Sequence, residues 1–165
     1  MLKRLLRKRW QVWTAGTAAV VTVGSIAWLV WGPGSEPDRE RRYRAETVCL
    51  LTGENGVRGT RAAPVWDGLQ RASVETLVKV SFVAVQGPQT PANAATYLAG
   101  LAQNRCDLLL AVDAAPVGAV AASAAALPRQ KFVVVGGAAA ANVSVLDGTS
   151  EAAYALLTES FTEDS

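Results

Sequence analysis

The sequence predicts an α/β domain with a doubly wound, mostly parallel sheet. Two short apolar runs, D-L-L-L-A-V at 107–112 and K-F-V-V-V at 131–135, are separated by an alanine-rich segment of helix length. Uninterrupted apolar strands on either side of a helix are typical of a parallel sheet buried on both faces. The chain has 165 residues, 50% of them apolar and 18% charged. This composition suits one ordinary domain and excludes disorder throughout.

Strand signals recur through the rest of the domain. T-V-C-L-L-T is a short apolar run, V-K-V-S-F-V-A-V combines alternation with β-branched residues, and N-V-S-V-L is a weaker signal. Strict alternation of strand and helix with right-handed crossovers favours the flavodoxin-like strand order 2-1-3-4-5. The expected strands are 47–52, 78–85, 107–112, 131–135 and 142–146.

Helices are expected between these strands, where apolar residues recur at helical spacing. Thr90 or Pro91 begins one helix, Pro128 follows the end of another, and Ser150 with Glu151 suits the start of the last. The expected helices are 61–77, 90–102, 116–127 and 150–161.

The amino-terminal part predicts a membrane anchor. No ionisable side chain appears from residue 10 to residue 35, and 10–31 is long enough as a helix to cross a bilayer. Tryptophan residues lie at both ends of this segment, where headgroups favour amphipathic rings. Five basic residues in 1–9 place the amino terminus in the cytoplasm and the rest outside. The alternative is a cleaved secretory signal, although no good A-x-A site follows.

The expected organisation is a cytoplasmic basic tail at 1–9, a single transmembrane helix at 10–31, a linker at 32–46 and a one-lobe α/β domain at 47–165. Charge is segregated between these parts. Residues 1–45 hold nine basic and three acidic residues, a net of +6, whereas 46–165 hold seven and eleven, a net of −4. The mildly acidic domain argues against nucleic acid as a partner.

Candidate ligand-binding residues follow the strands, because open α/β sheets bind ligands at the carboxyl ends of their strands. A carboxylate at Asp113 can accept hydrogen bonds from a sugar or a base, or it can cap the following helix. The stretch G-E-N-G-V-R-G forms either a backbone nest for an anion or a flexible turn. Two further glycines allow close approach to a ligand or to the next turn. The candidates are Thr52, Gly53, Glu54, Asn55, Arg58, Asp113, Gly136 and Gly137.

Catalysis has little support in the sequence. The chain contains no histidine, which removes histidine-based triads and metal sites, and no G-x-S-x-G motif. Lys79 and Lys131 begin strands, away from the carboxyl edge. We therefore expect neither enzymatic activity nor a metal site or cofactor.

Cys49 and Cys106 each lie near the amino-terminal end of a strand, and the two strands are expected to be neighbours. Their sulfur atoms can therefore approach within bonding distance, and a disulfide would persist outside the cell. A pair of buried free thiols is the alternative.

Four blocks occur in a distinctive order between residues 48 and 146: V-C-L-L-T-G, V-W-D-G-L, T-Y-L-A-G-L-A-Q-N-R-C-D-L-L-L-A-V and P-R-Q-K-F-V-V-V-G-G. Together they resemble the first lobe of the basic membrane protein family of ABC-transporter solute-binding proteins. The resemblance implies a type 1 periplasmic-binding fold, an ABC permease as partner and a ligand that is often a nucleoside. The stretch after the first strand departs from the family, whose ligand-contacting acidic, Asn and Phe residues are absent. The chain also has room for only one lobe, whereas the family closes two lobes on its solute.

These features predict an extracytoplasmic, membrane-anchored domain that recognises a small molecule, nucleoside-like by resemblance, in ABC transport or sensing. The alternative is a degenerate fold that serves as a structural or protein-interaction module of a membrane complex.

Overall fold

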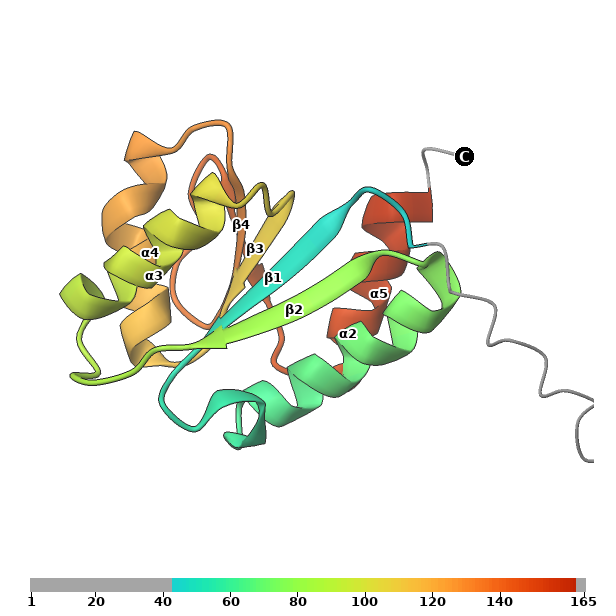
Figure 1. Cartoon of the computed structure of the whole chain (residues 1–165), viewed down its shortest axis with the longest axis horizontal. Coiled ribbons are helices and arrows are strands. Elements are labelled where there is room, and N and C mark those ends of the chain that lie inside the picture. The colour runs from blue at the N-terminus through green and yellow to red at the C-terminus, as the bar shows by residue number, and fades with distance from the viewer. Residues whose placement is uncertain (1–42, 163–165) are drawn as a thin grey trace, which may run out of the picture. The chain divides into compact units, whose positions relative to one another are not determined.

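A computed structural model describes residues 43–162. They belong to one compact unit, Arg41–Ser165, which contains a five-stranded sheet in the order β2-β1-β3-β4-β5 (Figure 1). All pairs of these strands are parallel, which confirms the predicted fold class and strand order. The strands are β1 (Thr47–Thr52), β2 (Lys79–Ala84), β3 (Leu108–Ala111), β4 (Lys131–Val135) and β5 (Val143–Leu146).

The helices lie close to their predicted positions, except around α4. Thr90 accepts a hydrogen bond from the Asn93 N–H and Pro91 occupies the first turn of α3, as expected for a helix start. The helices are α2 (Ala62–Thr76), α3 (Pro91–Gln103), α4 (Ala114–Ser123) and α5 (Ser150–Thr162), with 3-10 helices η1 (Gly56–Arg58) and η2 (Ala124–Ala126).

Helix α4 begins two residues before the predicted start and ends early. Pro116 lies in the first turn, where its missing N–H is not needed, so the helix can begin before it. At the other end, the alanine run continues as η2. The Asn142 side chain donates to the carbonyls of Ala124 and Leu127, which compensates for the helical bonds lost there.

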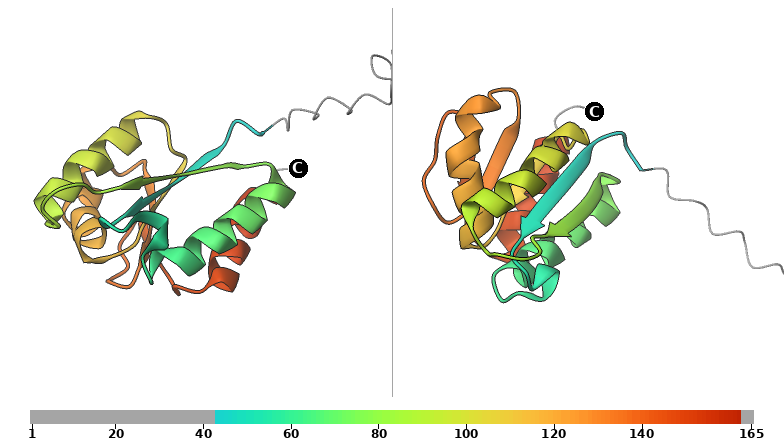
Figure 2. Two further views of the ribbon diagram at one scale, coloured as in Figure 1. Left: turned by 60° about the horizontal axis from the view of Figure 1, so that its bottom comes forward. Right: turned by 60° about the vertical axis from the view of Figure 1, so that its left-hand side comes forward.

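Two helical layers cover the two faces of the sheet, with α3 and α4 on one face and α2 and α5 on the other (Figure 2). Strands β1 and β3 lie in the centre and are buried almost throughout. Each has neighbours on both sides and a helical layer on each face. Strand β2, in contrast, lies at an edge and leaves Phe82 exposed beside Trp66.

Three of the predicted segments lie wholly or partly outside the described residues: the basic tail at 1–9, the transmembrane helix at 10–31 and most of the linker at 32–46. Among residues 43–162, no helix has the length and apolar character needed to cross a membrane. The end of the linker contacts the domain. The Arg44 backbone N–H donates to the Leu77 carbonyl, and Arg44 Nη1 donates to the Phe161 carbonyl.

Cys49 of β1 forms a disulfide with Cys106, which lies two residues before the start of β3. Their Cα atoms are 5.8 Å apart, and both residues are buried. The bond closes a loop with a sequence separation of 57, for which chain-entropy arguments give a stabilisation of about 4 kcal/mol. It stabilises the fold by restricting the unfolded chain, and it links β1 covalently to the segment that leads into β3.

Helices α2 and α5 pack in close contact at Gly68. A Cβ atom added to Gly68 would lie 2.1 Å from the Ser150 carbonyl oxygen and 2.9 Å from the Ala153 Cβ. On the exposed side of the same interface, Arg71 contacts Asp67, Glu151 and the Tyr154 ring. The Tyr154 hydroxyl donates to Glu75, which raises the pKa of Tyr154 above its usual value.

We expect Gly68→Ala to destabilise the domain by about 3 kcal/mol or more, because the methyl group would collide with backbone. Gly100→Ala on α3 is the matched control. Nothing lies within 4 Å of its added Cβ, so the change should stabilise the helix by up to about 1 kcal/mol. Urea unfolding of residues 41–165 measures both. Equal unfolding midpoints for the two variants would contradict the close α2–α5 packing.

Candidate functional site

The carboxyl ends of β1 and β3 meet at one edge of the sheet, and there the structure brings two predicted site residues into contact. Asp113 Oδ2 accepts a hydrogen bond of 3.0 Å from the Gly53 N–H. The opposite ends of the same strands carry a similar bond, from the Thr47 N–H to Asp107 Oδ2 at 2.7 Å. An aspartate next to β3 thus holds the β1 backbone at each end, and only Asp113 does so at the edge where ligands bind.

Asp113 occupies the N-cap position of α4, but its side chain does not cap that helix. The capping interpretation is thus correct for the position and wrong for the hydrogen bond. Its backbone has φ 79° and ψ 160°, a region populated almost entirely by glycine. Holding an aspartate there costs about 1–3 kcal/mol, and such strain often marks a functional position.

Gln89, which our sequence analysis did not select, lies beside these two residues. A Cβ atom added to Gly53 would lie 3.1 Å from Asp113 Oδ2 and 3.3 Å from Gln89 Oε1. The Gln89 amide nitrogen donates to the carbonyls of Val85 and Gly87, which directs the amide oxygen toward Gly53. The sequence could have indicated Gln89, because this residue follows β2 and the predicted strand order places β2 beside β1.

Two oxygen acceptors therefore converge near Gly53. Glu54 and Arg58 are exposed in the same loop, and their charges offset one another. Glu54, Arg58 and Asp113 together carry a net charge of −1. An edge of this kind favours hydrogen-bond donors, such as hydroxyl or amino groups, over an anion.

The other candidates from the first loop contribute less. Thr52 is completely buried, and its hydroxyl lies 3.2 Å from the Gly53 carbonyl and 3.3 Å from the Val83 carbonyl. Its side chain is therefore turned into the domain, and the prediction that Thr52 belongs to a ligand site stays a prediction. Asn55 is exposed, and its side chain does not cap η1.

Gly136 and Gly137 follow β4 with φ values of 80° and 94°, which favour glycine. A Cβ atom added to Gly137 would lie 3.0 Å from Val117 Cγ1, whereas one added to Gly136 would meet nothing within 4 Å. Gly137 therefore allows the turn to pack against α4, which precedes it in the chain, whereas the structural alternative considered from the sequence was close approach to the next turn. Space remains around Gly136, so no close contact in the domain requires a glycine at this position.

Within residues 43–162, no group of three Cys, Asp, Glu or His side chains is placed to hold a metal ion. Among the described residues, two further cavities have linings that do not include Gly53, Gln89 or Asp113. One lies between α4 and the β4–β5 connection, and the other is lined by residues of α2, β2 and Tyr43.

Comparison with known proteins supports the fold. No family model matches the sequence, and no curated protein matches it. A fragment of a provisionally named lipoprotein from Peptoclostridium difficile 630 has a similar structure, with a TM-score of 0.59 and 14% identity. The match covers 73% of this chain and 99% of that fragment.

An ABC transporter solute-binding protein from Aeropyrum pernix K1 is also similar, with a TM-score of 0.50 and 25% identity. The match covers 61% of this chain but only 28% of the solute-binding protein. The described domain thus has a periplasmic-binding-like fold, and it corresponds to a part of that larger protein.

We expect Asp113→Gly to be more stable than Asp113→Ala by about 1 kcal/mol. Both changes remove the bond to Gly53, but only glycine relieves the backbone strain. The same pair at Asp107, which lacks a positive φ, should show the reverse order by about 0.5–1 kcal/mol. Urea unfolding of the four variants gives the comparison. If alanine is the more stable replacement at both positions, Asp113 is not strained.

Proposed function

We propose that this chain displays a solute-binding-like domain outside the cell on a membrane anchor, where it recognises a small molecule for ABC transport or sensing. The observation that carries the proposal is Asp113, held in a strained conformation at the carboxyl edge of a periplasmic-binding-like fold. Strain persists where the surrounding structure enforces it, and such positions cluster at ligand sites. The carboxylate is thereby presented between β1 and β3 and is not used to cap α4.

The chemistry of the edge favours a neutral ligand rich in hydroxyl groups. Asp113 and Gln89 offer oxygen acceptors around Gly53, and a vicinal diol presents two hydroxyl donors that such acceptors can bind. The sequence blocks that resemble the basic membrane protein family point to nucleosides, whose ribose has such a diol. A nucleoside is thus the proposed ligand, and catalysis is not part of the proposed function.

The extracytoplasmic location rests on two independent observations. The basic residues of 1–9 precede the apolar segment 10–31, the charge pattern of an anchor with a cytoplasmic amino terminus. The Cys49–Cys106 disulfide belongs to the domain that follows, and such bonds persist in oxidising compartments.

The described domain corresponds to one lobe of a solute-binding protein, and further protein surface would complete the enclosure of a ligand. The chain matches only 28% of the solved solute-binding protein, and a single lobe leaves one side of a ligand in water. An ABC permease or another membrane protein that covers the carboxyl edge would complete the enclosure.

One observation favours the alternative of a structural or protein-interaction module. The Gly53 N–H and the Thr52 hydroxyl are both bonded within the domain. A ligand that needs these groups must displace protein contacts. If the hydrogen-bonding groups at the carboxyl edge all bond within the domain, the edge no longer binds a small molecule. It would then serve as a contact surface for a protein partner.

Binding of adenosine to residues 41–165 tests the proposed ligand class, with calorimetry and thermal shift as measurements. We expect Asp113→Asn to weaken binding at least about tenfold, because a hydrogen bond to a charged group contributes about 1.5–3 kcal/mol. Asp107→Asn is the matched control and should bind like the unmodified domain. If adenosine, inosine and ribose all fail to bind, the interaction module is favoured. If Asp113→Asn and Asp107→Asn bind adenosine equally well, the binding site does not include Asp113.

The location is tested by the state of the cysteines in the full chain. Cells that express it are lysed in the presence of an alkylating reagent, and the protein mass is measured before and after reduction. We expect neither cysteine to be modified until the disulfide is reduced. Modification of both cysteines without reductant would contradict an oxidised extracytoplasmic domain.

A further inference from the structure

The connection between β4 and β5 is unusually short for two parallel strands. It consists of seven residues, 136–142, and contains no helix. Parallel neighbours are normally joined by a dozen or more residues, usually an α-helix that covers the sheet. Here the connection folds back beside α4 and forms the bridge between Ala140 and Val143.

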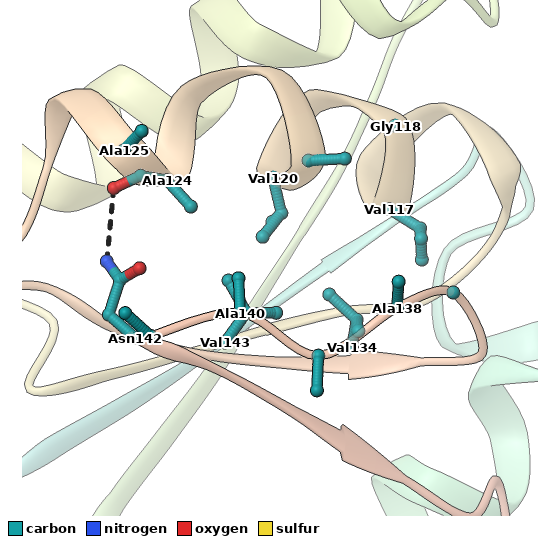
Figure 3. A pocket seen from close by; sticks show the side chains of 14 residues that line it. Val117, Gly118, Val120, Ala124, Ala125, Val134, Ala138, Ala140, Asn142 and Val143 are labelled. Atoms are coloured by element: carbon teal, nitrogen blue, oxygen red, sulfur yellow. Dashed lines mark hydrogen bonds between the residues drawn. The ribbon is translucent and has the colours of Figure 1, made fainter.

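This arrangement leaves a cavity of about 370 Å³ between α4 and the connection. In Figure 3, Val117, Val120 and Ala124 project from the helical side toward Ala138, Ala140 and Val143. Val120, Val134 and Val143 are at most 5% exposed. The cavity is therefore a recess that reaches the core of the domain, unlike a flat patch on its surface.

The lining is uncharged. Its residues are alanine, valine and glycine, apart from Asn142 at one end. Asn142 Nδ2 lies 3.0–3.1 Å from the carbonyls of Ala124, Leu127 and Gln130, so its hydrogens are committed to the protein. The side-chain oxygen is then the only side-chain polar atom in the lining that a ligand can use. A charged ligand would lose its hydration without compensation.

We propose that this cavity binds a neutral, mainly apolar small molecule about the size of a bicyclic aromatic compound, at a site whose lining includes Gly137 but not Gly53, Gln89 or Asp113. The volume of the cavity limits the size of the ligand. An apolar cavity of about 150 Å³ holds benzene, and 370 Å³ is more than twice that. The same volume equals less than one turn of a helix about 10 Å across, so a helix does not fit inside it. A single hydrogen-bond donor on the ligand can reach Asn142.

Indole is a suitable probe because it is neutral and bicyclic and has one N–H donor. It is titrated into residues 41–165, which form a compact unit with a core on both sides of the sheet. Methyl NMR follows the valines. We expect a Kd of about 1 mM or tighter, with shifts and intermolecular NOEs at Val117, Val120, Val134 and Val143.

Two substitutions by leucine distinguish a loss of binding caused by filling the cavity from one caused by adding a larger side chain to the domain. Ala140→Leu places extra volume within the lining and should weaken indole binding at least about tenfold. Ala122→Leu, at an exposed alanine of α4 outside the lining, should change it by less than about twofold. Asp113→Asn should also leave it unchanged, which separates this site from the proposed nucleoside site.

Three results would overturn the proposal: absence of indole binding, NOEs from indole to residues outside the lining, or equal binding by Ala140→Leu and the unmodified domain. Should Ala140→Leu fail to fold, the NOE pattern of the unmodified domain decides alone. Sedimentation at increasing protein concentration tests another occupant. The cavity would be assigned to a second copy of the chain if the protein self-associated and added indole did not reduce this self-association. The NMR signals of the four valines would then shift as the protein concentration rises.

Discussion

The pairing of β1 with β3 is the constraint on which the rest of this domain depends. These central strands are held by parallel backbone bonds, by the Cys49–Cys106 disulfide and by an aspartate at each end. Because both strands are buried, a shift in their register would move side chains on both faces of the sheet. The fixed register also determines that Asp113 lies opposite Gly53, so the geometry of the candidate site follows from the core.

Much of the fold could be predicted from the sequence because burial on both faces leaves a strong pattern. The run K-F-V-V-V gives β4 with its observed bounds, and the alternation of strand and helix determines the order of the sheet. The end of α4 was harder to place. The alanine run carries no stop signal, and the helix changes to η2 where Asn142, distant in sequence, provides donors.

The candidate site was predictable in location and less so in detail. The predicted pairing of the first and third strands correctly brings Gly53 and Asp113 together, although they are 60 residues apart. It cannot show which hydrogen bond each side chain makes. Thr52 turns into the protein, Asp113 bonds across to β1, and Gln89 enters from the β2 loop. These outcomes depend on distances between loops, which no periodicity in the sequence records.

The bond between Asp113 and Gly53 also limits how a ligand can bind. Only Oδ2 of the carboxylate accepts this bond, so a donor that approaches Oδ1 adds a hydrogen bond and leaves the link between β1 and β3 intact. A ligand that replaced the Gly53 N–H would leave a partly buried amide unpaired, at a cost of about 1–3 kcal/mol. The favoured ligand therefore approaches from the open side of the edge, where a second lobe or a membrane partner would also have to lie. A partner that covered a ligand bound there would contact the ligand as well as the domain, and only such contacts would make the binding of each favour the other.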